Sequence, residues 1–366
     1  MLTILIKKKG EKMSFKIGNR IIDNFSKPYF IADIGANHDG DLKRALMLIE
    51  LAAKCGADAA KFQNFKAETI VSKSGFDTMK KLTHQANWNK SVYEVYKDAS
   101  ISELWTDALK KKCDEVGIEY LTSPYEYDAV DLVDKYVKLY KIGSGDITWL
   151  DLIRYISSKG KPVLLATGAS EVADVDRAYN ELIKNDNGIC VMQCNTNYTG
   201  SEMNFDHVNL NVLEFYKERY PNAVIGLSDH TVGYSTVLGA IALGACVIEK
   251  HFTDDNNRVG PDHKFAMNPT SWRDMVTESN RLYRAMGKHL KTIENNEIES
   301  AIVQRRAIYT VRKLFAGDTL QKSDLIMLRP CKENGIEPYH IDSVIGKKIS
   351  VDIDADSMLK WSDLVD

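Results

Sequence analysis

Short apolar runs alternate with longer amphipathic stretches between residues 29 and 287. The longer stretches have helical periodicity, for example at residues 42–55, 102–116, 172–184 and 234–243, and several end at a glycine, as helix C-caps do. The short runs are rich in aliphatic and β-branched residues and have the length of buried strands. These predicted strands cover residues 29–33, 59–63, 118–122, 139–143, 162–167, 189–194, 223–228 and 246–251.

Eight successive strand-then-helix units fit two architectures. An open, doubly wound sheet could accommodate them, but eight such units close more readily into a barrel. We therefore predict the α/β fold class, with a (β/α)8 TIM barrel over residues 16–290 after an N-terminal extension at residues 1–15.

The character of the sequence changes after the last predicted barrel helix. Residues 291–304 are rich in charged and amide side chains and are predicted to be a linker. Residues 305–366 contain short strand-like runs and turns, and residues 316–325 are weakly repeated at 354–364. This pattern predicts a second, small, mainly β domain with two similar halves.

Composition excludes several classes of protein. The 48 basic and 51 acidic residues give a net charge of -3, so no large positive field is available to bind nucleic acid or an anionic membrane. Apolar runs fall short of the roughly 20 residues of a spanning helix, and the N-terminal lysines follow rather than precede a short apolar run, unlike a signal peptide. The six cysteines lack paired or zinc-ribbon spacing. We expect a cytoplasmic protein with reduced cysteines.

Polar residues gather at the ends of the predicted strands. In a barrel all of these ends face one mouth, which is where catalysis takes place. A single polar residue there could be a capping or hydrogen-bonded structural group, but the convergence of all eight ends favours an active site. The polar strand ends include Asp33, Asn37, His38, Lys61, Gln63, Thr122, Ser123, Lys141, Ser144, Asp146, Thr167, residues 193–198, Ser228, Asp229, His230, Glu249, Lys250 and His251.

His230 and His251 follow the seventh and eighth predicted strands, which are neighbours in a barrel. Two imidazoles so placed can bind one metal ion, although either could instead be a buried, hydrogen-bonded histidine. Two nitrogen ligands leave coordination positions open for water or substrate, which is typical of a Lewis-acid site. We expect Mn²⁺ or Mg²⁺ rather than Zn²⁺.

Lys61 and Lys141 lie within predicted strands, from which their ammonium groups can reach the mouth. With the hydroxyls of Ser123, Ser144 and Ser228 they form a candidate cradle for a phosphate and a carboxylate. The sequence has no Walker loop and no G-x-G-x-x-G after a strand, so a nucleotide cofactor is not expected. A small phosphorylated acid is the expected ligand.

Several motifs are similar to the N-acetylneuraminate synthase family: IADIGANHDG (31–40), AAKFQ (59–63), YKIGSGD (140–146), GLSDHT (226–231), EKHFT (249–253) and GPDHK (260–264). The resemblance runs from about residue 16 to the C-terminus. Residues 305–364 resemble the antifreeze-like (SAF) domain of that family.

The resemblance implies condensation of phosphoenolpyruvate with an acetamido sugar aldehyde, cleavage of the C–O bond of the phosphate ester, and a nine-carbon 2-keto acid product. The implied catalytic residues are Asp33, Lys61, Lys141 and the metal ligands His230 and His251. The implied substrate-binding residues are Gln63, Ser123, Ser144, Asn197, Tyr198, Ser228, Glu249, Asp262 and Arg329. The resemblance also implies a domain-swapped homodimer, in which Arg329 contacts the sugar of the neighbouring subunit.

The chain departs from the family pattern at the expected substrate site. Asp33 replaces a glutamate, Ala166 replaces a serine, Gln193-Cys194-Asn195 replaces His-Cys-Thr, and Thr199 replaces a proline. These changes leave the sugar open between N-acetylmannosamine, a diacetamido-trideoxyhexose and a further analogue. The GPDHK motif resembles the neuraminate and legionaminate branches more than the pseudaminate branch, so we expect the manno configuration.

Two other functions fit parts of the sequence. One is a barrel synthase that joins phosphoenolpyruvate to a phosphorylated pentose or tetrose, which would lack the terminal domain. The other is a catalytically silent carbohydrate- or ice-binding protein. Ice binding would be favoured by a flat, regular threonine array, and residues 305–366 contain none.

Overall fold

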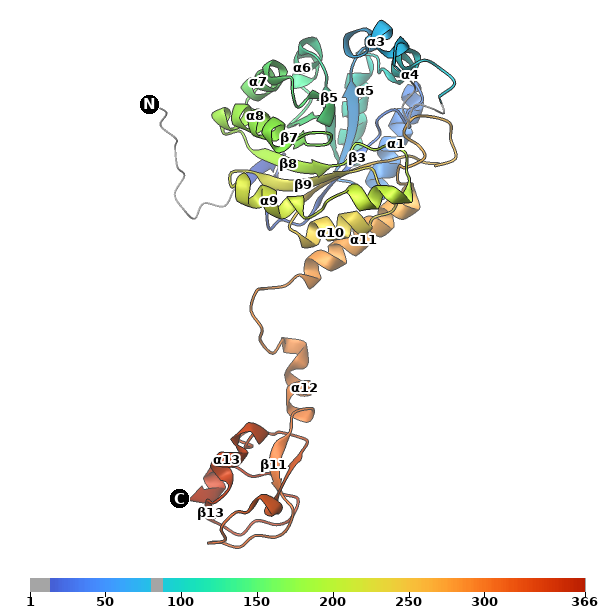
Figure 1. Cartoon of the computed structure of the whole chain (residues 1–366). Coiled ribbons are helices and arrows are strands. Elements are labelled where there is room, and N and C mark those ends of the chain that lie inside the picture. The colour runs from blue at the N-terminus through green and yellow to red at the C-terminus, as the bar shows by residue number, and fades with distance from the viewer. Residues whose placement is uncertain (1–13, 80–87, 366) are drawn as a thin grey trace, which may run out of the picture. The chain divides into compact units, whose positions relative to one another are not determined.

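The computed structural model describes residues 14–79 and 88–365. The chain forms two compact units, and the boundary between them in the sequence lies between Gly287 and Lys288 (Figure 1). Residues 1–13 of the expected N-terminal extension lie outside the described residues. The last two residues of that extension are instead part of strand β1 (Ser14–Ile17).

The first unit is built on eight parallel strands. Their hydrogen-bonded order is β5-β4-β3-β10-β9-β8-β7-β6, and β5 and β6 contact each other, so the sheet closes into a ring. The predicted (β/α)8 barrel is therefore confirmed, and an open doubly wound sheet is excluded. The strands are β3 (Tyr29–Asp33), β4 (Ala59–Asn64), β5 (Glu119–Pro124), β6 (Tyr140–Ile142), β7 (Val163–Ala166), β8 (Ile189–Cys194), β9 (Val224–Asp229) and β10 (Val247–His251).

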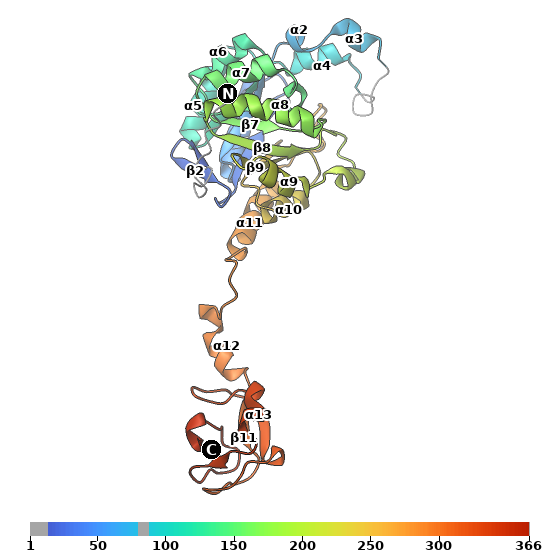
Figure 2. The ribbon, with the colours of Figure 1, turned by 60° about the vertical axis from the view of Figure 1, so that its left-hand side comes forward.

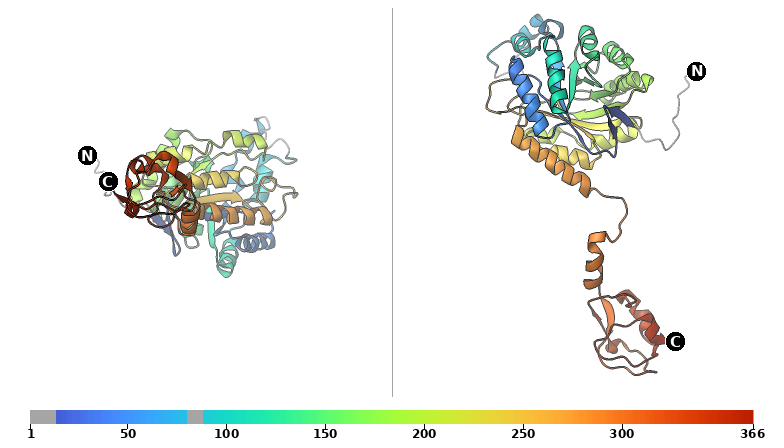
Figure 3. Two further views of the ribbon diagram at one scale, coloured as in Figure 1. Left: turned by 90° about the horizontal axis from the view of Figure 1, so that it is seen from below. Right: turned by 180° about the vertical axis from the view of Figure 1, so that it is seen from behind.

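Helices surround the strands, as Figure 2 shows. The right-hand view of Figure 3, which shows the molecule from behind, has α1 and α5 side by side on the barrel wall. The helices of the wall are α1 (Leu42–Lys54), α5 (Trp105–Val116), α6 (Tyr127–Asp134), α7 (Leu150–Ser158), α8 (Val172–Leu182), α9 (Val212–Arg219), α10 (Ser235–Ala242) and α11 (Pro269–Ala285). In the part of the chain that the structure describes, none of the helices combines the length and the apolar character needed to cross a membrane.

An excursion that the hydrophobic pattern did not predict follows β4. It contains α2 (Ala67–Ile70), α3 (Lys73–Asp77) and α4 (Val92–Ala99), which gather at one end of the barrel (Figures 1 and 2). Helix α4 begins with a capping box in which the Ser91 hydroxyl accepts from the Glu94 amide and the Glu94 carboxylate accepts from the Ser91 amide. This S-x-x-E motif is the sequence signal that could have located the helix.

Apolar side chains close the amino-terminal end of the barrel. The hairpin of β1 and β2 (Arg20–Asp23) buries Phe15, Ile17 and Ile22 in a cluster with inward-facing strand residues such as Ile31 and Leu121. Fully burying such side chains contributes about 1.5–3 kcal/mol each. Because this end is filled, a ligand has to enter at the carboxyl ends of the strands.

The second unit is a small domain with a core that includes Ile308, Leu320 and Ile336. The predicted similarity of its halves is visible in two matching turns. The Gln321 amide donates to Asp324 before β12 (Leu325–Leu328), and the Lys360 amide donates to Asp363 before β14 (Leu364–Val365), each at 2.9 Å. The other strands and α-helices are α12 (Ile298–Val303), β11 (Ala307–Thr310), α13 (Ile341–Val344) and β13 (Lys348–Ile349), and the 3-10 helices are η4 (Asn295–Glu297), η5 (Lys322–Asp324), η6 (Pro338–His340) and η7 (Trp361–Asp363). Helix α12 occupies part of the segment that was expected to be a linker.

Candidate active site

A cavity of about 420 Å³ lies at the carboxyl ends of the barrel strands. Each of the eight strands, or the loop that follows it, contributes to the lining. The predicted site residues that line it are Asp33, Lys61, Gln63, Ser123, Lys141, Ser144, Tyr198, Ser228, Glu249, His230, His251 and Asp262. The strand ends therefore do converge on one site.

Two predicted site residues are not in the lining. Asn197 is exposed, and its side-chain oxygen accepts from the amide and the hydroxyl of Thr199 at 3.1 and 2.7 Å, so it shapes its own loop. Arg329 follows β12 in the second unit. Asp229 and Lys250, which were also noted as polar strand-end residues, lie outside the lining. The Lys250 ammonium donates to the Asp229 carboxylate at 2.5 Å within the barrel wall.

Four buried charged side chains form a chain of ion pairs inside the cavity. The Lys61 ammonium donates to Asp33 Oδ2 at 2.6 Å and lies 3.6 Å from Glu249 Oε1, which also accepts from the Lys141 ammonium at 2.9 Å. Burial opposes ionisation of Glu249, but Lys141 and Lys61 outweigh it and lower its pKa to about 2. Burial likewise disfavours the Lys61 ammonium, but Asp33 and Glu249 raise its pKa. Lys61 and Glu249 are therefore both charged at neutral pH.

The serine hydroxyls of the cavity differ in their bonding. Ser228 donates to Glu249 Oε1 at 3.2 Å, and the Ser144 hydroxyl accepts from the Gly168 amide at 2.9 Å. The Ser123 hydroxyl is buried without a hydrogen-bond partner among the described residues. A buried hydroxyl in that state is satisfied when a polar ligand binds.

The rings of the two histidines lie next to each other, with centroids 5.3 Å apart and planes tilted by 53°. His230 Nδ1 donates to the Asn195 carbonyl at 2.8 Å, which leaves Nε2 as the acceptor nitrogen. His251 Nε2 lies 3.4 Å from Asp33, and His251 Nδ1 lies 3.5 Å from Asp262. Burial and the neighbouring His251 lower the pKa of His230 to about 3, so its imidazole is neutral at physiological pH.

This donor set fits a divalent metal ion. A metal-binding histidine commonly donates its second ring nitrogen to a backbone carbonyl, as His230 does. Within residues 14–79 and 88–365, no three His, Cys, Asp or Glu side chains form a ready-made metal cage. Water and substrate would therefore complete the coordination of an ion held by His230 and His251, which is the character of a catalytic rather than a structural metal site.

Asp262 and Tyr198 lie next to the histidines. The Asp262 carboxylate accepts from the Ala36 amide at 3.0 Å, and a Cβ atom on Gly35, whose φ is +48°, would lie only 2.7 Å from that carboxylate. Glycine is therefore required at position 35. The Tyr198 ring packs edge-on against His230, with centroids 4.4 Å apart.

The sequence interpretation missed several lining residues. Phe65, Ile70, Val95 and Tyr96 come from the excursion after β4 and give the cavity an apolar wall. Asp146 was recognised as a strand-end residue but not included in the candidate site, although it lines the cavity two residues after Ser144. Burial raises the pKa of Asp146 to about 6.

The raised pKa of Asp146 predicts a pH-dependent stability. Because the pKa in the folded protein exceeds the ordinary value of 3.8, ionisation disfavours the folded state, and stability is lost as the pH rises through about 6. Relative to Asp146→Asn, the wild type should lose at most about 3 kcal/mol between about pH 4 and pH 7. Urea unfolding across this range measures the loss, and a difference that does not vary with pH would contradict the account.

Comparisons with known proteins agree with this geometry. The NeuB family model matches residues 48–291, and the SAF domain model matches residues 305–365. N,N'-diacetyllegionaminic acid synthase of Legionella pneumophila is 33% identical over 91% of this chain and 93% of its own length. Human N-acetylneuraminate-9-phosphate synthase is 28% identical over 92% of each chain.

A solved structure supports the same assignment. The N-acetylneuraminic acid synthetase of Leptospira borgpetersenii superposes with a TM-score of 0.69 at 26% identity, covering 79% of this chain and 95% of that one. The resemblance inferred from the motifs is thus confirmed. The chain is an enzyme of the NeuB family of nonulosonic acid synthases and carries a C-terminal SAF domain.

Proposed function

We propose that the protein condenses phosphoenolpyruvate with an open-chain, manno-configured acetamido sugar and water, releasing phosphate and a nonulosonic acid. The observation that carries this proposal is the juxtaposition, in one cavity, of two buried lysines and two adjacent histidines. The lysines suit an anionic substrate, and the histidines suit a metal ion that would polarise the carbonyl group of an aldehyde.

The lysine side of the cavity is the proposed phosphoenolpyruvate site. Each ammonium has three donors, so Lys61 and Lys141 can bind phosphate and carboxylate oxygens while keeping contact with Asp33 and Glu249. The unpartnered Ser123 hydroxyl and the Ser144 hydroxyl, which accepts from the Gly168 amide, add further donors. Ser228 adds another if its hydroxyl turns from Glu249 to the ligand. Donors fixed in a buried site stabilise developing charge more strongly than donors in water.

The histidine side is the proposed aldehyde site. A Mn²⁺ or Mg²⁺ ion held by His230 and His251 would supply Lewis-acid polarisation of the carbonyl oxygen. Asp33, between Lys61 and His251, is placed to accept a proton from water. In the reaction, C3 of phosphoenolpyruvate forms a bond to the aldehyde carbon as the C=O π bond breaks, water adds to C2, and the C2–O bond to phosphate breaks to leave the 2-keto group. One proton of the water ends on the former aldehyde oxygen and the other on the released phosphate.

The manno configuration is supported by the relatives. The legionaminic acid synthase of Legionella pneumophila is 33% identical, whereas the pseudaminic acid synthase of Campylobacter jejuni strain 81-176 is 28% identical. Tyr198 and Asp262 are proposed sugar contacts because they lie beside His230 and His251. Gln63 is a third, because it lines the same cavity 3.5 Å from Asp33.

We further propose a domain-swapped homodimer in which Arg329 of one SAF domain donates to the sugar in the other subunit. Residues 286–294 separate the last barrel helix from η4 and contain no assigned helix or strand. Nine extended residues can span roughly 30 Å, a length that supports exchange of the domain between subunits.

The direct test is phosphate release from phosphoenolpyruvate with Mn²⁺ and a panel of aldoses. The panel contains N-acetylmannosamine, the manno and altro diacetamido-trideoxyhexoses, and a phosphorylated pentose and tetrose. We expect turnover only with acetamido sugars, and faster turnover with a manno than with the altro substrate. Turnover confined to the phosphorylated sugars would favour the other barrel synthase, and none at all would favour a silent binding protein.

Variants of the histidines test the metal assignment in the same assay. His230→Ala and His251→Ala should each remain folded, bind Mn²⁺ at least about 10-fold more weakly and show negligible turnover, because each removes one of two protein ligands. Metal analysis after gel filtration measures the first effect. Stoichiometric manganese with full turnover in either variant would contradict its role as a ligand.

Complementation tests the domain swap. In a swapped dimer of His251→Ala with Arg329→Ala, one site carries both lesions and the other carries none, so co-refolded mixtures should regain about a quarter of wild-type activity. If each Arg329 serves its own barrel, every site keeps one lesion. Absence of activity in verified heterodimers would therefore reject the swap and leave the barrel chemistry intact.

A further inference from the structure

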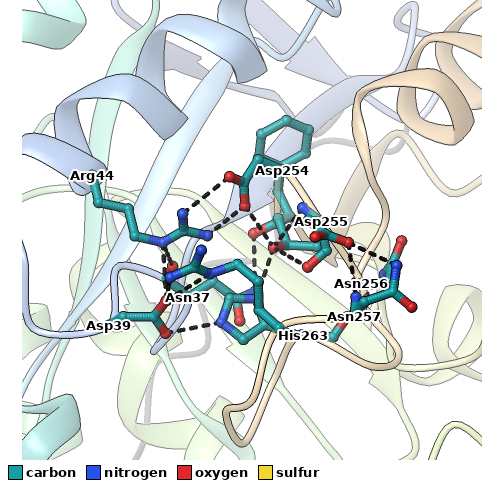
Figure 4. Close-up of polar contacts among 11 residues, drawn as sticks. Asn37, Asp39, Arg44, Asp254, Asp255, Asn256, Asn257 and His263 are labelled. Carbon is teal, nitrogen blue, oxygen red and sulfur yellow. Dashed lines mark hydrogen bonds and ion pairs between the residues drawn. The ribbon is translucent and has the colours of Figure 1, made fainter.

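A second polar cluster joins the loop after β3 to the loop after β10, next to the cavity (Figure 4). Its central residues are Asp39, Arg44, Asp254 and His263, which we call the Asp39–His263 network. None of the four lines the cavity or belongs to the proposed site.

Asp39 is the acceptor of this network. Its Oδ1 accepts from His263 Nε2 at 2.9 Å, and its Oδ2 accepts from the Arg258 guanidinium at 2.7 and 2.9 Å. Arg44 Nε lies 3.1 Å from the same Oδ2. One carboxylate thus binds groups from the β10 loop and from helix α1.

Arg44 ties the start of α1 to both loops. Its Nε donates to the Asn37 carbonyl at 2.8 Å, and its two terminal nitrogens bind the two oxygens of Asp254 (Figure 4). The arginine side chain is only 10% exposed. A planar, two-point contact of this kind fixes direction as well as distance.

His263 is fully buried and is held on both sides of its ring. Nε2 donates to Asp39, and Nδ1 bonds to the Thr253 hydroxyl at 2.7 Å. The packing around it is close, because a Cβ atom on Gly260 would lie 2.6 Å from the ring. The ring is therefore packed tightly against the backbone of Gly260.

Asp262, the residue before His263, points the other way, into the cavity. Its carboxylate accepts from the Ala36 amide at 3.0 Å and lies 3.5 Å from His251. Ala36 is three residues before Asp39. The same two loop segments thus meet twice, once in the cavity and once in the network outside it.

We propose that Asp39 and His263 are positioning residues that hold the Asp262 carboxylate beside His251 for contact with the substrate. The identity of that substrate rests on the proposed function. The geometry of the Asp39–His263 network is observed independently of it. Misplacing a substrate-orienting group by about 1 Å can lower a rate by about 100-fold, so a network of this kind affects catalysis without touching the substrate.

Kinetics separate this role from a purely structural one. His263→Ala should raise the KM for the sugar about 10-fold and leave the KM for phosphoenolpyruvate within about 2-fold, because the lysine side is untouched. His263→Gln, which can keep a donor toward Asp39, should recover part of the loss. In an Asp262→Asn background, His263→Ala should have no further effect on the sugar KM. Multiplicative losses in the double variant would overturn the proposal.

Hydrogen exchange gives a readout that does not depend on activity. The Ala36 amide donates to Asp262, so its exchange should accelerate about 10-fold or more in His263→Ala and in Asp39→Asn, even if the wild type turns over no sugar. Asp39→Asn is the second variant if His263→Ala does not fold. The matched control is Asp176→Asn, which breaks an exposed pair with Arg219 on the barrel wall and should change nothing. Unchanged Ala36 exchange in both network variants would overturn the proposal.

Discussion

The buried chain of charges from Asp33 through Lys61 and Glu249 to Lys141 is the interaction on which the site depends. Taking a single charge out of water costs several kcal/mol, so each of these groups requires its partner. The two negative charges of the carboxylates formally balance the two positive charges of the ammonium groups. Removing one partner of such a set typically costs about 3–5 kcal/mol, because the charge left behind is uncompensated.

Strand register creates this arrangement. In the parallel ladder, Asp33 of β3 is the register partner of Lys61 on β4 and of His251 on β10. Glu249 is likewise level with Ser228 on β9. Register partners in a sheet point to the same face, so Lys61 of the proposed anion site and His251 of the proposed metal site both become neighbours of Asp33 through backbone pairing.

Asp33 belongs to both halves of the site. Its Oδ2 contacts Lys61 at 2.6 Å and lies 3.4 Å from His251, so it links the proposed anion site to the proposed aldehyde site. By the family resemblance a glutamate is usual at this position, and the shorter side chain here is engaged by Lys61. Asp33 therefore connects the two halves of the proposed site.

Much of this could be predicted from the sequence because buried parallel strands are continuous apolar runs whose last residues all reach the mouth. Asp33, Lys61, His230 and His251 were found in that way. The pairing of each lysine with a carboxylate was not predicted, because it depends on which strands are level across the barrel. Tyr96 was missed because its helix, α4, lies in the segment after β4 whose helices the hydrophobic pattern did not predict. Asn197 was misplaced because loop hydrogen bonds direct its side chain.

In the proposed reaction, phosphoenolpyruvate is joined to a sugar aldehyde and the C–O bond of its phosphate ester breaks. Phosphoenolpyruvate labelled with ¹⁸O at the oxygen that bridges C2 and phosphorus tests this directly. The account predicts that the label leaves with phosphate, where the isotope shift of its ³¹P resonance reveals it. Unlabelled phosphate, formed together with the nonulosonic acid, would mean that the P–O bond breaks and would contradict the proposed chemistry.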